Sequence, residues 1–155
     1  MHARYVLIHN QQWEAILKKI RASVKPGGYV VLQEPDLTSA TLPNASVEPA
    51  LQRVNNAICQ MFLKPGLDPG YGIGLPRKAA KEGFDIVRVS STMHLCQGLG
   101  LISPLMVASA EALREKYIGT GVTTDQDIDW YMTCTHDSGY WALYYSTVSV
   151  MATVR

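Results

Sequence analysis

The tetrapeptide Lys25-Pro26-Gly27-Gly28 separates a helical pattern from an apolar run, and this order constrains the fold more than any other feature. Before it, apolar residues recur at the spacing of one helical face: Trp13, Ile16, Leu17, Ile20 and Val24. Pro26 cannot continue a helix, and either glycine can adopt the left-handed turn that ends one. Residues 29–33 then form an apolar run without alternation, which is typical of a buried parallel strand.

Residues 4–9 form an earlier apolar run that is rich in strand-forming residues, and Asn10 can cap the helix that follows it. A strand, a helix and a second strand in this order predict a right-handed crossover and a parallel pair. Further along, the patterns predict helices at residues 47–63, 76–83, 104–117 and 124–136, and strands at 84–95 and 143–154. The sequence therefore predicts an α/β fold, and its 155 residues suit a single domain over 1–155.

The composition excludes several classes of protein. Fourteen Lys and Arg against thirteen Asp and Glu give a net charge of +1, which argues against a nucleic-acid-binding domain. No stretch approaches the ~20 apolar residues of a membrane span. The three cysteines form no CxxC pattern, and the four histidines lack metal-ligand spacing. We therefore expect reduced thiols in a cytoplasmic protein, with no metal site, no nucleic acid partner and no membrane partner.

The apolar run at residues 29–33 stops at Glu34-Pro35-Asp36. Proline has no N–H to donate, so we expect it to end the strand ladder there. Ligands of open α/β sheets bind outside the carboxyl ends of the strands. Glu34 is therefore a candidate to bind a substrate, and the alternative is a solvated strand end. Asp36 more simply satisfies loop backbone groups.

Three stretches carry recognisable patterns. Residues 3–36 read ARYVLIHNQQWEAILKKIRASVKPGGYVVLQEPD, residues 70–90 read GYGIGLPRKAAKEGFDIVRVS, and residues 148–155 read VSVMATVR. In this order they resemble strands four and five with the helix between them, the short helix before strand six, and the antiparallel strand seven of class I S-adenosylmethionine-dependent methyltransferases. Two positions depart from the family pattern: Val24 replaces the leucine of LKPGG, and Glu82 replaces the alanine before Gly83-Phe84.

The resemblance implies a partial Rossmann-like methyltransferase fold, with a mixed sheet of strands four, five, seven and six and helices on both faces. The family's glycine-rich turn after strand one and the acidic end of strand two do not occur in this sequence. The glycines at residues 70–74 precede a short helix and fail as a dinucleotide fingerprint. We therefore expect the C-terminal half of a methyltransferase domain, with Met1 as an internal start or a fragment boundary.

The resemblance also implies site residues. His2, Ala3 and Arg4 fall at the end of strand four, against the methionine part of S-adenosylmethionine, and the alternative is a frayed N-terminus. His9 follows this strand as a catalytic candidate, because a neutral imidazole can accept a proton near pH 7; the alternative is a polar helix-entry residue. Tyr71 is a candidate to bind substrate from a loop that covers the crevice, and the alternative is an exposed loop aromatic.

Three functions stay open at this point. The first is an S-adenosylmethionine-dependent methyltransferase acting on a small, partly apolar molecule. The second is a non-enzymatic remnant that forms a homo-oligomer through the exposed edge of strand four. The third is another α/β nucleotide-dependent enzyme, such as a reductase, although the sequence has no Tyr-x-x-x-Lys pair that resembles a reductase site.

Overall fold

The computed structural model describes residues 1–41 and 48–154. The chain forms two compact units, and it passes between them four times. Unit 1 comprises Met1–Asp36, Gly66–Met93 and Ser146–Arg155, and unit 2 comprises Leu37–Pro65 and His94–Tyr145. A single domain over residues 1–155 stays a prediction. Within the described residues, no helix is long and apolar enough to cross a membrane.

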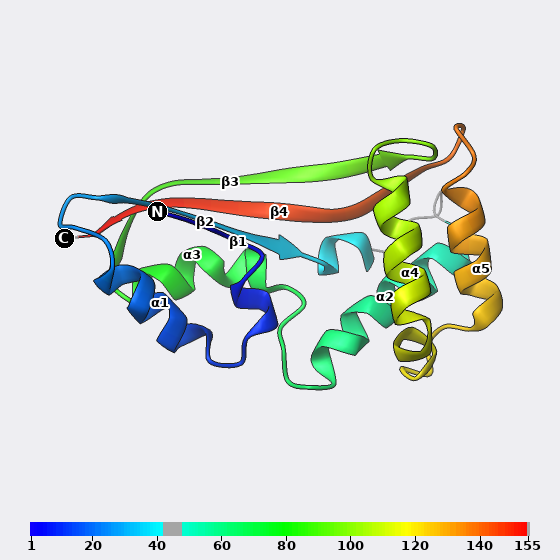
Figure 1. Ribbon diagram of the computed structural model, residues 1–155, viewed down its shortest axis with the longest axis horizontal. Coiled ribbons are helices and arrows are strands. Elements are labelled where there is room, and N and C mark those ends of the chain that lie inside the picture. The colour runs from blue at the N-terminus through cyan, green and yellow to red at the C-terminus, as the bar shows by residue number, and fades with distance from the viewer. Residues whose placement is uncertain (42–47, 155) are drawn as a thin grey trace. The chain divides into compact units, whose positions relative to one another are not determined.

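A four-stranded sheet has the order β1-β2-β4-β3 (Figure 1). The strands are β1 (His2–Arg4), β2 (Tyr29–Asp36), β3 (Phe84–Gln97) and β4 (Trp141–Val154). β1 pairs with β2 in parallel, and β2 pairs with β4 in the antiparallel sense. The pairing with β4 continues through Pro35 and Asp36, so the prediction that Pro35 ends the ladder was wrong. In the strand numbering of the methyltransferase family that the sequence resembles, the order β1-β2-β4-β3 corresponds to strands four, five, seven and six. The predicted mixed α/β fold and its strand order are therefore confirmed.

The first strand is shorter than predicted. β1 ends at Arg4, and Leu7–His9 form a short 3-10 helix, η1, in place of the expected strand over residues 4–9. Asn10 does not cap the next helix, because its side-chain amide donates to the carbonyl oxygen of Val6. Helix α1 spans Trp13–Ala22 and begins after Gln12. Strand propensity alone predicted these residues wrongly, since contacts with a distant residue bend the chain here.

Two helices of unit 1 lie side by side. They are α1 and α3 (Tyr71–Lys81). The Trp13 and Tyr71 rings meet edge-on with centroids 5.8 Å apart, and Lys81 Nζ lies 3.2 Å from Glu14 Oε1. Both helices lie on the same face of the sheet (Figure 1). This refines the expected helices on both faces: two right-handed crossovers that move in one direction across a sheet place their helices on one face.

Helix α3 starts at Tyr71, five residues before the predicted helix at residues 76–83. A Cβ atom on Gly72 would lie 2.8 Å from the carbonyl oxygens of both Glu34 and Pro35. The first turn of α3 therefore lies directly against the end of β2, at a distance that only glycine permits. Pro76 lies inside the helix rather than in its first turn.

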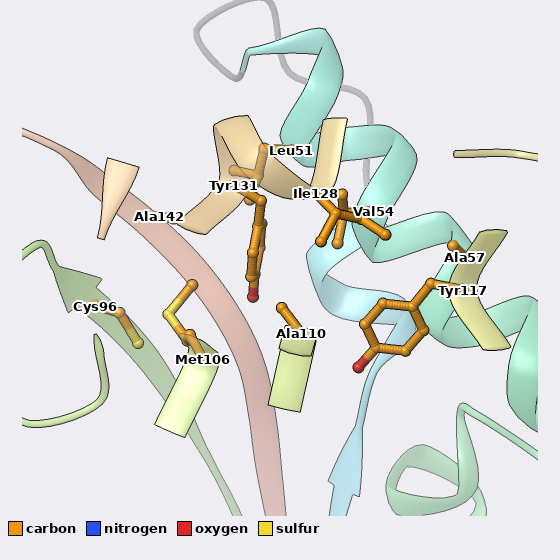
Figure 2. Packing of buried hydrophobic residues seen from close by; sticks show 10 residues of the cluster. All are labelled: Leu51, Val54, Ala57, Cys96, Met106, Ala110, Tyr117, Ile128, Tyr131 and Ala142. Carbon is orange, nitrogen blue, oxygen red and sulfur yellow. The ribbon is translucent and has the colours of Figure 1, made fainter. Parts of the chain in front are cut away.

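Unit 2 is built from α2 (Pro49–Leu63), α4 (Ser103–Ile118) and α5 (Asp125–Cys134), with a short 3-10 helix, η2, at Thr38–Thr41. Buried residues from all three α-helices, with Cys96 of β3 and Ala142 of β4, form one hydrophobic cluster (Figure 2). The predicted helices are confirmed with small shifts, although position 47 lies outside the described residues. Thr124 caps α5 in a reciprocal capping box with Asp127.

Candidate functional site

A buried carboxylate holds the turn that follows β1. Glu34 is 0% exposed, and its Oε1 accepts hydrogen bonds from the backbone N–H groups of Val6 (3.0 Å) and Leu7 (2.8 Å). Its Oε2 accepts from the N–H of Ile8 at 3.1 Å. One side chain thus satisfies three successive backbone donors, of which those of Leu7 and Ile8 would otherwise be buried without partners. Glu34 fixes η1 at the carboxyl ends of β1 and β2.

Three neutral backbone donors, and a smaller electrostatic contribution from His9, stabilise the charged form of Glu34. Burial raises the pKa of Glu34, while the N–H groups of Leu7, Ile8 and Val6 lower it in part, and the net shift is upward. Because the carboxylate is fully buried and both of its oxygens are engaged, its direct role in this structure is to position η1. Its predicted contact with a substrate stays untested.

The three predicted cofactor-binding residues form β1 itself. Ala3 is half-buried and pairs with Leu32, while the side chains of His2 and Arg4 are exposed. His2 Nε2 lies 2.8 Å from Oε1 of Gln33. The Arg4 guanidinium stacks over the Tyr5 ring, 4.7 Å from its centroid. The end of β1 therefore presents an imidazole and a guanidinium at the surface.

Tyr5 is a residue that sequence reasoning missed. Its φ angle is +55°, in the left-handed region that non-glycine residues rarely adopt. Its N–H donates to the carbonyl oxygen of Gln33 at 2.8 Å, and its hydroxyl lies 2.6 Å from Thr147 Oγ1. These two contacts hold the chain at the point where it leaves β1. The sequence gives no signal for this conformation, because tyrosine within an apolar run reads as strand.

His9 and Tyr71 occupy very different positions. His9 ends η1 and is exposed. Tyr71 is the first residue of α3 and is only 2% exposed, so it is neither a mobile lid nor an exposed loop aromatic. Lys78 Nζ lies 3.8 Å above the centroid of the Tyr71 ring. The tyrosine is buried because α3 begins early and packs against the end of β2.

The Tyr71 hydroxyl is buried and has no hydrogen-bond partner within the described part of the chain. Burial raises its pKa well above the ordinary value, and the nearby carboxylates of Glu34, Asp68 and Glu14 raise it further. The phenol is therefore protonated at neutral pH. Tyr71 cannot serve as a proton acceptor there, and its contribution is an aromatic wall.

A pocket of about 240 Å³ lies beside Tyr71, within unit 1. Its walls are contributed by η1, the start of α1 and the segment before α3: Leu7, Ile8, Asn10, Gln11, Trp13, Gly66, Leu67, Asp68 and Tyr71. Asp68 is held by Lys78, whose Nζ lies 2.8 Å from Oδ2. The pocket thus combines two aromatic rings, aliphatic side chains, two amides and a carboxylate.

Of the residues predicted from the sequence, only Tyr71 lines this pocket. Glu34 acts on the pocket indirectly, because it anchors the η1 residues Leu7 and Ile8 that form one wall. His2, Ala3, Arg4 and His9 do not line it. Sequence reasoning missed Trp13 and Asp68, since Trp13 read as part of an apolar helix face and Asp68 lies outside the predicted helices and strands.

Comparisons with known proteins agree with this architecture. A family model described as a methyltransferase domain matches residues 1–68. The crystal structure of the [4+2]-cyclase SpnF superposes with a TM-score of 0.51 at 14% sequence identity, covering 99% of this chain and 49% of that one. Phospholethanolamine N-methyltransferase 2 of Haemonchus contortus, solved with phosphomonomethylethanolamine and S-adenosylhomocysteine, gives a TM-score of 0.42 at 11% identity, covering 99% of this chain and 32% of that one. Curated protein sequences give no match.

The resemblance to class I S-adenosylmethionine-dependent methyltransferases is therefore confirmed, by the match over residues 1–68 and by the fold. The chain spans about half the length of the SpnF chain and about a third of the Haemonchus enzyme. SpnF is described as a cyclase, so this fold by itself does not fix the reaction.

Proposed function

We propose that this chain takes part in methyl transfer from S-adenosylmethionine to a small-molecule acceptor. The observation that carries the proposal is the methyltransferase-domain match over residues 1–68, which contain β1, η1, α1 and β2. When bound, S-adenosylmethionine supplies a methyl group on a sulfonium, which is a good leaving group. Such a reaction asks the protein mainly to position two reactants and to exclude water.

The donor side of the proposed site is the end of β1. The exposed Arg4 guanidinium suits a carboxylate, which is the chemistry of the methionine part of S-adenosylmethionine. His2 and Ala3 lie on the same three-residue strand. We propose that these three residues contact the donor, and that Glu34 and Tyr5 hold the turn in the shape that this contact needs.

The acceptor side of the proposed site is the pocket beside Tyr71. Its volume of about 240 Å³ suits only a small molecule, and its rings and aliphatic walls suit a partly apolar one. His9 does not line the pocket, but it directly follows the lining residue Ile8 at the end of η1, so we propose it as the base if the acceptor loses a proton. Tyr71 is a wall of this pocket and takes no proton.

A labelled methyl-transfer assay tests the proposal. The 155-residue chain is incubated with methyl-labelled S-adenosylmethionine and small molecules grouped by acceptor class: aromatic hydroxyls, amines and carboxylates. We expect label in one class, with release of S-adenosylhomocysteine, and we expect the Asp68→Asn variant to change which acceptor is preferred. No transfer to any class, with no binding of S-adenosylhomocysteine, would contradict the proposal.

A second candidate function is that of a non-enzymatic subunit that forms a homo-oligomer through the edge of β1. The observation that favours it is the position of β1 at the end of the described sheet, where β2 is its one neighbouring strand. In this case the chain would bind S-adenosylhomocysteine weakly or not at all and would transfer no methyl group. A parallel titration with a nicotinamide cofactor tests the reductase alternative, for which we expect no binding.

A further inference from the structure

The strand β3 lies at the opposite end of the sheet from β1 (Figure 1). Within the described sheet β4 is its only neighbour, so the other side of β3 is an open edge. Every residue from 87 to 93 is exposed. We call these seven residues of unit 1 the edge segment.

Apolar side chains are exposed along the edge segment. Val87 is 52% exposed, Val89 47% and Met93 61%, and they share one side of the strand because side chains alternate along it. Proteins usually protect an open edge with lysine, proline, glycine-linked bulges or a short strand. The edge segment has no proline, glycine or lysine, its single charge is Arg88, and it belongs to a strand of 14 residues.

The edge segment is complementary to itself. In an antiparallel pair related by a two-fold axis at Ser91, Val89 lies opposite Met93 of the second copy. Ser90 lies opposite Thr92 of the second copy, and Ser91 lies opposite its own counterpart. Apolar residues thus face apolar residues, hydroxyls face hydroxyls, and no pair of like charges forms between residues 89 and 93. A two-fold interface requires this self-matching, because the same surface must serve both copies.

We propose that two copies of this chain pair edge to edge through β3, around a two-fold axis at Ser91. The two sheets then join into one continuous sheet of twice the width, and the exposed N–H and C=O groups of both edge segments find partners. The occupant is a second copy because the segment matches its own reversed sequence. This interface is distinct from the β1 edge, where only three residues form the strand and two of them, His2 and Arg4, carry exposed polar side chains.

Sedimentation velocity over a wide range of protein concentrations tests the proposal. We expect a reversible dimer in the wild-type chain. In the Val89→Lys variant we expect the Kd of the dimer to rise by about tenfold or more. The two-fold axis places a lysine opposite Met93 in both halves of the interface. The matched control is Ile73→Lys, which makes the same change at an exposed residue of α3 and should leave the dimer unchanged.

Cysteine cross-linking tests the register independently of any loss of stability. Ser91→Cys should form a disulfide-linked dimer under mild oxidation, since residues opposite each other in antiparallel strands have the Cα separation of a disulfide. Val87→Cys, four residues from the axis, should not. A wild-type chain that is monomeric at every concentration would overturn the proposal. So would a dimer that survives Val89→Lys, or one that Ser91→Cys fails to trap.

Discussion

Two buried carboxylates show how different surroundings tune the same chemical group. Glu34 is held by three neutral backbone donors, and burial still raises its pKa. Asp127 in unit 2 forms two hydrogen bonds with the Arg53 guanidinium, at 3.0 and 2.5 Å, and this cation holds the pKa of Asp127 well below its ordinary range. Asp127 thus forms a structural ion pair with Arg53, while Glu34 positions a turn at the candidate site.

The Glu34→Gln variant tests the role of this carboxylate. Glutamine keeps an oxygen for two donors but turns its NH₂ group toward the N–H of Ile8, so we expect about 1–3 kcal/mol less free energy of unfolding. Because the pKa of Glu34 is higher in the folded chain than its ordinary value of 4.5, Glu34 contributes most to the stability of the wild-type chain below pH 4.5. This contribution to stability falls as the pH rises through the pKa of the folded state. The destabilisation should therefore shrink with rising pH.

Urea unfolding at a series of pH values provides the measurement, with Glu14→Gln as the control. Glu14 forms an exposed ion pair with Lys81, so we expect a change of at most about 0.5–1 kcal/mol. If Glu34→Gln were as stable as the wild-type chain, or if its deficit grew with rising pH, the anchoring role would be wrong.

At the scale of elements, local patterns predicted the structure wherever local contacts decide it. The Lys-Pro-Gly-Gly boundary, the strand order and the Thr124 cap of α5 follow from neighbouring residues and from the resemblance. The end of β1 and the start of α3 were predicted wrongly for one shared reason. Both depend on the end of β2, where Glu34 binds donors 26 to 28 residues away and Gly72 contacts carbonyl oxygens far from it in sequence. No short window contains that information.

The candidate site was predictable only in part, for the same reason. The sequence pointed to the carboxyl ends of β1 and β2, which is where Glu34 and η1 lie. It could not reveal the pocket, because Trp13 and Tyr71 come from separate helices that meet only in the folded chain.

A pair of glycine substitutions tests the contact between α3 and β2. Gly72→Ala places a methyl group 2.8 Å from two backbone carbonyl oxygens, which cannot move aside, and should cost about 1–3 kcal/mol of stability. Gly74→Ala, in the same helix, meets side-chain atoms rather than backbone: its three nearest atoms belong to Lys78, the first at 2.9 Å. At Gly74 the higher helix propensity of alanine should raise the free energy of unfolding by about zero to 1 kcal/mol.

Thermal or urea unfolding of the two variants gives the comparison directly. Equal effects of Gly72→Ala and Gly74→Ala would mean that the close approach of α3 to β2 does not matter for stability. A loss at Gly72 alone would support the account of why Tyr71 is buried and why the pocket beside it forms.

At the scale of the whole molecule, one part of the chain carries the likeness to methyltransferases. The family match covers residues 1–68, which include every proposed donor contact. The fold match covers 99% of the chain, yet it accounts for 49% of the SpnF chain. The central claim is therefore specific: the end of β1 contacts the donor.

Calorimetric titration of S-adenosylhomocysteine tests that claim most directly, using the wild-type chain, Arg4→Ala and the matched control Arg77→Ala on the exposed side of α3. We predict saturable binding by the wild-type chain with a Kd in the micromolar range, which corresponds to a binding free energy of about −8 kcal/mol. Arg4→Ala should weaken this binding by roughly tenfold or more, as expected for a lost hydrogen bond to a charged group, while Arg77→Ala should leave it unchanged. No binding by the wild-type chain, or equal binding by all three proteins, would contradict the account.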